Sequence, residues 1–457
     1  MNEEAKRQEE KRIRMTTAPV ERLICKLAVP TIISMLVTTF YNMADTFFVG
    51  KLDNTSATGA VGVVFSMMAI IQAVGFFFGH GSGNYISRML GNGRIEEAER
   101  MAATGFVWSI LGGSLIMVVG LVFLEPITYL LGATPTILPY AKDYMRVILL
   151  GAPIMCGSLV LNNQLRFQGN AFYSMVGLSA GAVLNIALDP LLIFTFDMGV
   201  LGAAVATVIS QAVSFVLLLV GVSKGDSLKI HLRNFTPKGS YLLEIVRGGT
   251  PSLGRQGLAS VATMCLNNMM RAFGDPAIAA MAIVSRITMF MASAMIGFGQ
   301  GFQPVCGFNY GAKLYGRVRR AFFFCLKVSV VFLLCICTVV FLLAPQVVSL
   351  FQKNDAEVLQ IGAIALRCQL VAMPLMAFVV MANMMLQTIG MMWRATVLAT
   401  ARQGLCFIPV VLILPRFLDI WGVYLAQPAA DLVAFLVALP ITLAVLREMK
   451  AAEERQA

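Results

Sequence analysis

Long apolar stretches, separated by short charged or turn-forming segments, make up most of the chain. About 20 apolar residues can cross a bilayer as a helix, and each stretch reaches that length. A longer polar segment, residues 223–240, separates the first six stretches from the last six. The pattern predicts an all-α integral membrane protein with twelve transmembrane helices. They are expected at about residues 27–50, 57–87, 101–124, 139–165, 167–196, 199–222, 248–272, 277–308, 319–351, 357–389, 391–415 and 420–446.

The distribution of lysine and arginine predicts the orientation in the membrane. Twelve helices place both ends of the chain on one side, and cytoplasmic loops are enriched in Lys and Arg. With the termini inside, the inner segments carry 24 basic residues, whereas the outer loops and their margins carry five. We therefore expect both termini in the cytoplasm.

The chain also matches itself at an offset of about 220 residues. Because each half holds six helices, the halves share one orientation, which predicts two pseudo-symmetric six-helix bundles related by an axis along the membrane normal. The aligned pairs include Pro30 and Pro251, Gly79 and Gly299, Gly81 and Gly301, Arg146 and Arg367, and Asn162 and Asn383. The expected units are a cytoplasmic N-terminal segment (1–22, a short helix rather than a cleavable signal), an N-lobe (23–222), a cytoplasmic inter-lobe linker (223–247), a C-lobe (248–447) and a cytoplasmic tail (448–457).

Composition agrees with a membrane protein and disfavours other classes. Apolar residues make up 58% of the chain and charged residues 13%, against about 45–50% and 25% in soluble domains. The net charge of +11 fits basic cytoplasmic loops, so we expect a lipid bilayer and no nucleic acid as partner. The nine cysteines show no zinc-ligand spacing, which argues against a structural metal. Only His80 and His231 are present, without an H-E-x-x-H or G-x-S-x-G motif, so we do not expect an enzyme or a cofactor.

Three acidic residues fall inside predicted helices: Asp45, Asp189 and Asp431. A charge at a helix centre costs roughly 2.5–3.5 kcal/mol on insertion scales, so each is a functional candidate. Counted from the helix ends, Asp45 and Asp189 lie at similar depth in the outer half of the N-lobe, as does Thr207. Asn185 precedes Asp189 by one helical turn, and Tyr41 precedes Asp45 in the same way.

Two carboxyls, an amide and a hydroxyl suit the reversible binding of a proton or of Na⁺. One member of a close carboxyl pair can hold a proton near neutral pH, and the same oxygens suit a hard cation. Alternatively, Asp45 and Asp189 form structural pairs with intramembrane arginines. Asp431 is equally compatible with a pair to Arg402 and with a contact to substrate. The arginines available for pairing are Arg146, Arg255, Arg286, Arg367 and Arg402.

Further residues are expected to bend helices or to support the site. Pro30 and Pro190 each remove a backbone hydrogen bond, and Pro190 directly follows Asp189, so it is either a coupling point or a fixed kink. The 28 methionines favour an adaptable cavity. Candidates for supporting the ion site or lining a substrate cavity are Tyr41, Asn42, Asn162, Gln164, Met270, Arg286, Asn383 and Asp431.

Four segments of the sequence carry a family resemblance: YNMADTFFVG (41–50), LNIALDPLLIF (184–194), GVLGAAVAT (199–207) and WGVYLAQPAAD (421–431). They resemble the multidrug and toxic compound extrusion (MATE) family, in particular its bacterial MepA-like members near the DinF-like branch. The resemblance extends from about residue 20 to 447. It implies a monomeric transporter of the bacterial inner membrane that works by alternating access. It also implies export of cationic amphipathic drugs in exchange for H⁺, which we prefer, or Na⁺.

The resemblance assigns the cation site to Asp45, Asn185, Asp189 and Thr207. The NorM-like branch carries an acid in helix 7, where this chain has Arg255, Gln256, Asn267 and Asn268 instead. Coupling is therefore expected in the N-lobe. Two alternatives remain. One is a major-facilitator carrier, although the loop between helices 2 and 3 of this chain, SRMLGNGRIEEAER, does not match the motif of those carriers. The other is a lipid-linked oligosaccharide flippase, which the intramembrane arginines leave open.

Overall fold

The computed structural model describes residues 3–52, 55–224, 227–351 and 355–456. Within these residues it contains helices and no strand, which confirms the predicted all-α membrane fold. The long helices are α2 (Val20–Gly50), α3 (Thr55–Gly91), α4 (Ile95–Val122), α6 (Leu138–Phe167), α7 (Ala171–Pro190), α8 (Gly199–Ser223), α9 (Gly239–Met270), α10 (Asp275–Gly311), α11 (Tyr315–Leu342), α13 (Ala356–Thr388) and α17 (Ile420–Glu454). The shorter ones are α1 (Glu3–Thr17), α5 (Leu124–Leu130), α12 (Ala344–Ser349), α14 (Met392–Thr400), α15 (Phe407–Ile413) and α16 (Pro415–Leu418).

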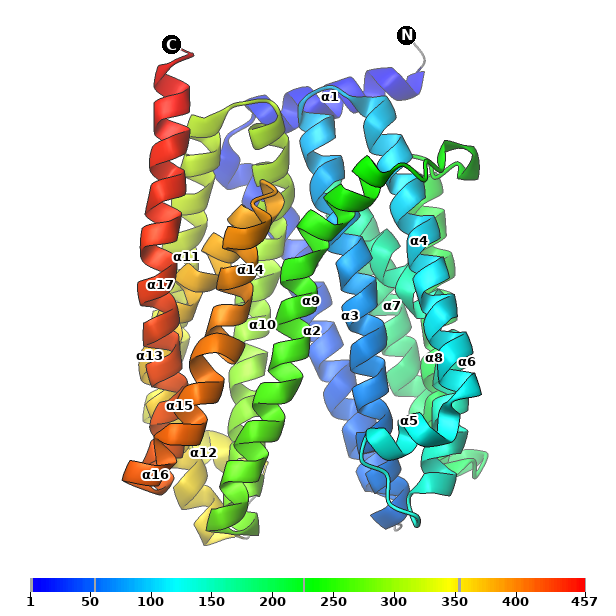
Figure 1. The fold of residues 1–457 in the computed structure, drawn as a ribbon, viewed down its shortest axis with the longest axis vertical. Coiled ribbons are helices and arrows are strands. Elements are labelled where there is room, and N and C mark those ends of the chain that lie inside the picture. The colour runs from blue at the N-terminus through cyan, green and yellow to red at the C-terminus, as the bar shows by residue number, and fades with distance from the viewer. Residues whose placement is uncertain (1–2, 53–54, 225–226, 352–354, 457) are drawn as a thin grey trace.

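Eleven of the twelve predicted spans are long and apolar enough, among the described residues, to cross a membrane. The remaining predicted span, 248–272, corresponds to α9, which is 32 residues long but more polar because it includes Glu244, Arg247 and Arg255. It begins at Gly239 rather than at 248, so part of the predicted linker is helical. α9 nevertheless runs along most of the molecule (Figure 1), and it packs against α3.

Several predicted helices are interrupted. The predicted helices 101–124 and 319–351 are instead α4 and α11, followed by the short α5 and α12. The predicted helix 391–415 contains a π-helical turn, η4 (Ala401–Cys406), between α14 and α15. Another π-helical turn, η1 (Leu191–Thr195), follows Pro190 directly. Single π turns inside helices are frequent at functional sites, and apolar periodicity does not reveal them.

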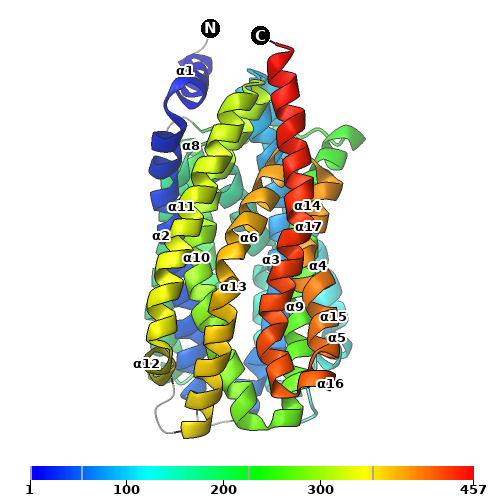
Figure 2. The same ribbon diagram turned by 90° about the vertical axis from the view of Figure 1, so that its left-hand side faces the viewer.

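The helices form two groups, α2–α8 and α9–α17, with both chain ends at the same end of the molecule (Figure 1, Figure 2). The groups meet where α2 packs on α10 and where α3 packs on α9 and α10. The internal repeat is visible in single hydrogen bonds. Asn162 Nδ2 donates to Ser174 O (3.2 Å), and its counterpart Asn383 Nδ2 donates to Ala395 O (2.6 Å). Each bond joins two helices that follow one another in the chain, α6 to α7 and α13 to α14.

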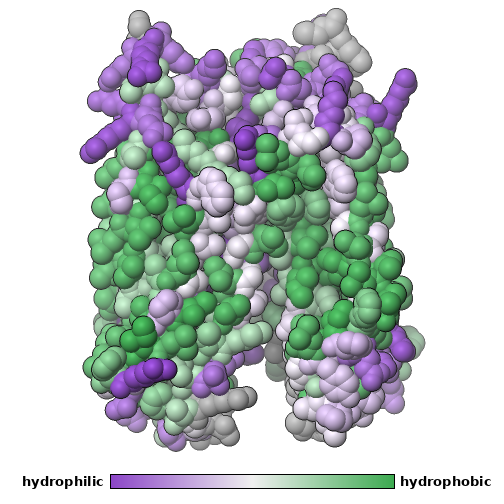
Figure 3. Space-filling view, in the orientation of Figure 1, coloured by the Kyte–Doolittle hydropathy of each residue, from purple (hydrophilic) through white to green (hydrophobic). Residues whose placement is uncertain are grey.

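Glycines allow the two halves to approach closely near the end that carries the termini. A Cβ on Gly81 of α3 would overlap the backbone of Ile245 in α9, and one on its repeat partner Gly301 would overlap that of Ala28 in α2. At the opposite end the halves separate and leave an open cleft, and apolar side chains form a broad band across the middle of the face in view (Figure 3). If the termini are cytoplasmic, as predicted, the cleft opens outward.

Polar contacts close the end near the termini. Arg88 of α3 forms an ion pair with Glu244 of α9 (2.9 Å) and donates to Thr388 O of α13 (2.9 Å). The N-terminal helix α1, which the sequence predicted, bridges both halves. Its Lys11 Nζ donates to Asn170 Oδ1 (3.0 Å), and Asn309 Nδ2 of α10 donates to the Met15 carbonyl (3.1 Å).

Candidate functional site

The acidic residues of the N-lobe meet where α2, α7 and α8 pack together, with α6 against α8. Asp189 and Asn185 lie on one face of α7 and are 0% and 1% exposed, and Thr207 of α8 is 1% exposed. Asp45 of α2 is only partly buried. The structure therefore brings the four predicted cation-site residues together.

Asn185 connects α7 to α8. Its amide satisfies its neighbours in one orientation, in which Nδ2 donates to Asp189 Oδ2 (3.0 Å) and Oδ1 accepts from the Thr207 backbone N–H (3.2 Å). The bond to Asp189 spans one helical turn, as the sequence spacing predicts. Asn185 thus holds the Asp189 carboxyl in a defined position.

The carboxyls of Asp45 and Asp189 are close enough for a hydrogen bond between them when one carries a proton. Each also has a buried oxygen, Oδ1, without a hydrogen-bond partner among the described residues. Neither of these two carboxyls forms an ion pair with a Lys or Arg among the residues that the structure describes. Two carboxylates in such contact cannot both stay ionised without a compensating cation. The pair therefore needs a shared proton or a bound cation.

Two tyrosines complete this cluster. The hydroxyls of Tyr41 and of Tyr144, in α6, both contact the Thr207 side chain. Tyr41 was predicted, whereas Tyr144, 1% exposed, was missed. Two features of the sequence could have pointed to Tyr144. A tyrosine hydroxyl that is buried in an apolar helix needs a polar partner, and Tyr144 lies near the outer end of its helix, at the depth of Asp45.

The donor set consists of oxygens from two carboxyls, an amide and hydroxyls, which fits H⁺ or a hard cation such as Na⁺. Among the described residues no three His, Cys, Asp or Glu side chains gather as a metal site. What this cluster can do chemically is bind and release a small cation.

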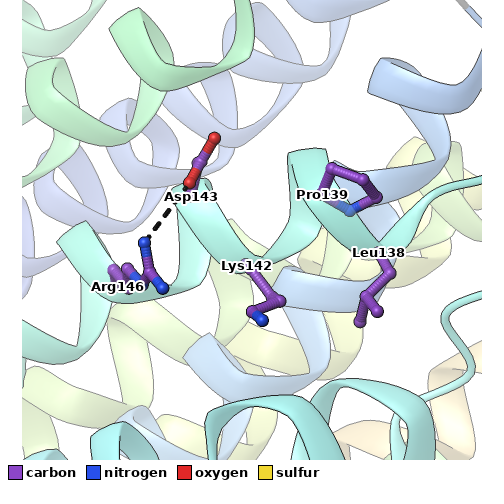
Figure 4. A pocket seen from close by; sticks show the side chains of 5 residues that line it. All are labelled: Leu138, Pro139, Lys142, Asp143 and Arg146. Atoms are coloured by element: carbon purple, nitrogen blue, oxygen red, sulfur yellow. Dashed lines mark ion pairs between the residues drawn. The ribbon is translucent and has the colours of Figure 1, made fainter.

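The alternative of arginine pairing is not observed for Asp45 or Asp189 within the described part of the chain. Arg146 is exposed on α6, 3.7 Å from Asp143, where the two line a shallow depression with Lys142 (Figure 4). Arg367 Nε donates to Phe341 O (3.1 Å). Treating Arg146 as a buried partner was therefore wrong, since its place in an apolar stretch did not show which face it occupies.

Asp431 does have an arginine partner. Arg402 Nε donates to its Oδ1 (2.7 Å), and Gln427 Nε2, one turn earlier on α17, donates to the same atom (2.9 Å). Asp431 is 2% exposed. Of the two alternatives left open for this residue, the ion pair is the one that the structure contains.

The remaining candidates are dispersed. Asn162 and Asn383 join neighbouring helices, as described above, and Gln164 Nε2 donates to Ser82 Oγ (3.0 Å) inside the N-lobe. Met270 is fully buried in the core of the C-lobe. Asn42 is partly buried on α2, and Arg286 is exposed on α10. The structure does not gather these six residues into one cavity.

The two prolines lie in different surroundings. Pro190 is the last residue of α7, so the π-helical turn η1 begins directly beyond Asp189. Pro30 lies inside the continuous α2, next to Thr31, whose hydroxyl donates across the lobe interface to Gly297 O (2.6 Å). Pro190 is thus adjacent to the carboxyl pair, and Pro30 is adjacent to the contact between lobes.

Comparisons with known proteins agree with this architecture. The sequence profile of the MatE family matches residues 30–191 and 251–413, one match in each half. Multidrug export protein MepA of Staphylococcus aureus (strain MSSA476) is 28% identical over 426 residues, which cover 92% of this chain and 94% of MepA.

Solved structures are also similar over nearly the whole chain. The outward-facing conformation of a multidrug resistance MATE family transporter of the MOP superfamily has a TM-score of 0.91 and 28% identity, and covers 96% of this chain and 98% of its own. A MOP superfamily transporter from Pyrococcus furiosus, whose binding pocket is described as having reverse polarity that suggests a different function, has a TM-score of 0.90, 28% identity and the same coverage.

Proposed function

Because the chain belongs to the MatE family, we propose that it is a secondary active antiporter that exports amphipathic molecules in exchange for a cation. Transport proceeds by alternating access: the two halves rock about the α2–α10 and α3–α9 contacts so that the cleft opens to either side in turn. The proteins that share its fold and family transport substrates, and we place this chain among transporters rather than enzymes.

The observation that carries the proposal is the pair of carboxyls, Asp45 and Asp189, in mutual contact without a basic partner in the described part of the chain. A fixed ion pair such as Asp431–Arg402 has no need of an external ion. A carboxyl pair does, and its charge changes when the ion leaves. Cation binding shifts the conformational equilibrium only if the two conformations bind the cation unequally. Asp45, being partly exposed, is the residue through which the cation enters.

We prefer H⁺ to Na⁺ as the coupling ion. A proton needs only the two carboxyls that already touch, whereas a hard metal cation takes about six or more oxygen ligands. The substrate class that we propose is the cationic amphipathic drugs, because the relative MepA is named a multidrug export protein. The proposed location is the bacterial inner membrane, with both termini in the cytoplasm and the chain acting as a monomer.

The test measures efflux of a cationic dye from proteoliposomes in which a pH gradient or a Na⁺ gradient is imposed separately. We expect the pH gradient to drive efflux, and Asp45→Asn or Asp189→Asn to lower the driven rate at least tenfold. Asp143→Asn is the matched control, since Asp143 is an exposed acid on α6 that pairs with the exposed Arg146. Wild-type rates in both site variants would exclude the carboxyl pair from coupling, and a Na⁺-driven rate alone would reverse the choice of ion.

A further inference from the structure

Two guanidiniums lie near the point where the halves come together and the cleft ends. Arg166, at the end of α6, is 2% exposed. Arg255 of α9 is partly exposed and lies one turn beyond Ser252, whose hydroxyl contacts His80 Nδ1 of the opposite half (3.2 Å). Residues three apart share a helix face, so Arg255 follows Ser252 on the face of α9 that turns toward the N-lobe. α9 runs from the closed end to the open end (Figure 1), so Arg255, three residues further along this helix than Ser252, lies nearer the open end.

Neutral groups surround Arg166. Its guanidinium donates to Asn163 Oδ1 (2.6 Å) and to Gln303 Oε1 of the opposite half (2.8 Å). His80 Nε2 lies 3.4 Å away, while its Nδ1 lies 3.2 Å from Phe76 O. This arrangement assigns the proton to Nδ1, so that Nε2 accepts from Arg166 and the imidazole is uncharged.

Arg255 adds a second positive charge to the same region. It interacts electrostatically with both Arg166 and His80. Within residues 3–52, 55–224, 227–351 and 355–456, neither guanidinium forms an ion pair, and Arg255 forms no hydrogen bond there. Two other acids have other partners: the buried Asp431 pairs with Arg402, and the half-buried Glu244 pairs with Arg88.

Positive charge removed from water without a counter-charge is strongly unfavourable. A carboxylate or phosphate would relieve it, because the planar guanidinium donates two parallel hydrogen bonds to such oxyanions. The partly exposed Arg255 can contact a ligand in the cleft, and the buried Arg166 strengthens the local positive field.

We propose that Arg255, with Arg166 behind it, forms an oxyanion subsite at the closed end of the cleft, which binds the carboxylate or phosphate group of an amphiphilic substrate. The inference rests on the proposed function in that the cleft is the substrate route. It extends the substrates from cations to zwitterionic and anionic amphiphiles. The carboxyl pair of the N-lobe remains the cation site and takes no part in this contact.

The experiment measures equilibrium binding to the purified full chain in detergent, by fluorescence anisotropy, with two dyes. One is a rhodamine with a free carboxylate, and the other is its methyl ester, which differs only in lacking the anionic group. We expect Arg255→Gln to weaken binding of the carboxylate dye at least tenfold and of the ester less than twofold, since a charge-assisted hydrogen bond is lost only for the former. Arg255→Lys, which keeps the charge, should give an intermediate loss.

Arg367→Gln is the control, because Arg367 is a partly exposed arginine of α13 that donates to the Phe341 carbonyl and lies over the Phe341 ring. Elution volume and thermal unfolding establish that each variant is folded. Equal losses for both dyes, or no loss for the carboxylate dye, would overturn the proposal.

A second arm repeats the titration in nanodiscs of phosphatidylcholine with and without phosphatidylglycerol. If phosphatidylglycerol competes with the carboxylate dye in the wild type and this competition disappears in Arg255→Gln, the bound oxyanion is a lipid phosphate. If phosphatidylglycerol does not compete while the dye difference persists, the bound oxyanion is the substrate carboxylate.

The binding assay is independent of ion coupling. It imposes no ion gradient, and the carboxyl pair is intact in the Arg255→Gln variant, so the difference between the two dyes reports the oxyanion contact alone. Failure of the coupling experiment with the dye difference intact would therefore refute the antiport mechanism alone, and the reverse result would refute the oxyanion subsite alone.

Discussion

The partner of each buried carboxyl decides what that residue can do. Asp431 lies 2.7 Å from Arg402, which neutralises it, whereas Asp45 and Asp189 face each other. An opposite charge makes a buried acid a fixed structural element, but a like charge makes it dependent on a mobile cation. All three are aspartates in apolar helices, so only their neighbours distinguish them.

Tyr144→Phe tests the residue that the sequence did not reveal. Loss of a hydroxyl that contacts Thr207 should cost about 1 kcal/mol, and so weaken the response of efflux to the cation gradient about fivefold without unfolding the protein. The measurement is the gradient dependence of dye efflux in proteoliposomes. Tyr129→Phe, 44% exposed, is the control. An unchanged response would show that Tyr144 only packs beside the site.

Among the secondary-structure elements, breaks and close contacts carry more information than regular helix. The π-helical turn η1 starts directly after the Asp189–Pro190 dipeptide, so the carboxyl lies beside irregular hydrogen bonding that can rearrange more easily than a regular ladder. At the interface between halves, Gly81 and Gly301 allow α3 to touch α9 and α10 to touch α2. The repeat places both contacts at equivalent heights.

Gly81→Val should disfavour the conformation in which this end is closed. The added side chain meets the backbone of Ile245, which cannot rotate away, and overpacking of this kind costs about 1–3 kcal/mol. Spin labels at the start of α4 and the end of α17 should therefore report a longer distance. Gly62→Ala, at a position with open space around its Cβ, should leave the distance unchanged. An unaltered distance for Gly81→Val would mean that the interface yields without opening.

At the scale of the whole molecule, two similar halves are held together at one end and apart at the other. Buried polar bonds and ion pairs between them concentrate at the closed end, among them Arg88–Glu244 and Arg166–Gln303. Opening that end requires these bonds to break together. Their strength therefore sets the balance between the two conformations of a transporter.

Arg88→Gln should shift this balance more than Arg320→Gln. Arg88 and Glu244 are 12% and 21% exposed in their side chains, whereas the pair Arg320–Glu21 is 71% and 31% exposed. The first substitution is expected to cost about 1.5–3 kcal/mol, and the second less than about 1 kcal/mol. Faster hydrogen exchange at the start of α9 in Arg88→Gln alone is the expected result. Equal exchange in both variants would contradict an important contribution of this ion pair.

The helical membrane fold, the repeat and the family could be predicted from the sequence, because apolar length and recurring residues are local properties of the chain. The sequence also aligned Asp45, Asn185, Asp189 and Thr207 in depth, since helix rise converts residue number into height. It could not show which face a residue occupies. The tertiary structure alone placed Tyr144 beside Thr207, joined Arg402 to Asp431 and moved Arg146 to the surface. It also left Arg255 without an acidic partner among the residues that it describes. Such contacts depend on how separate helices rotate and pack against one another, and hydropathy does not encode that rotation.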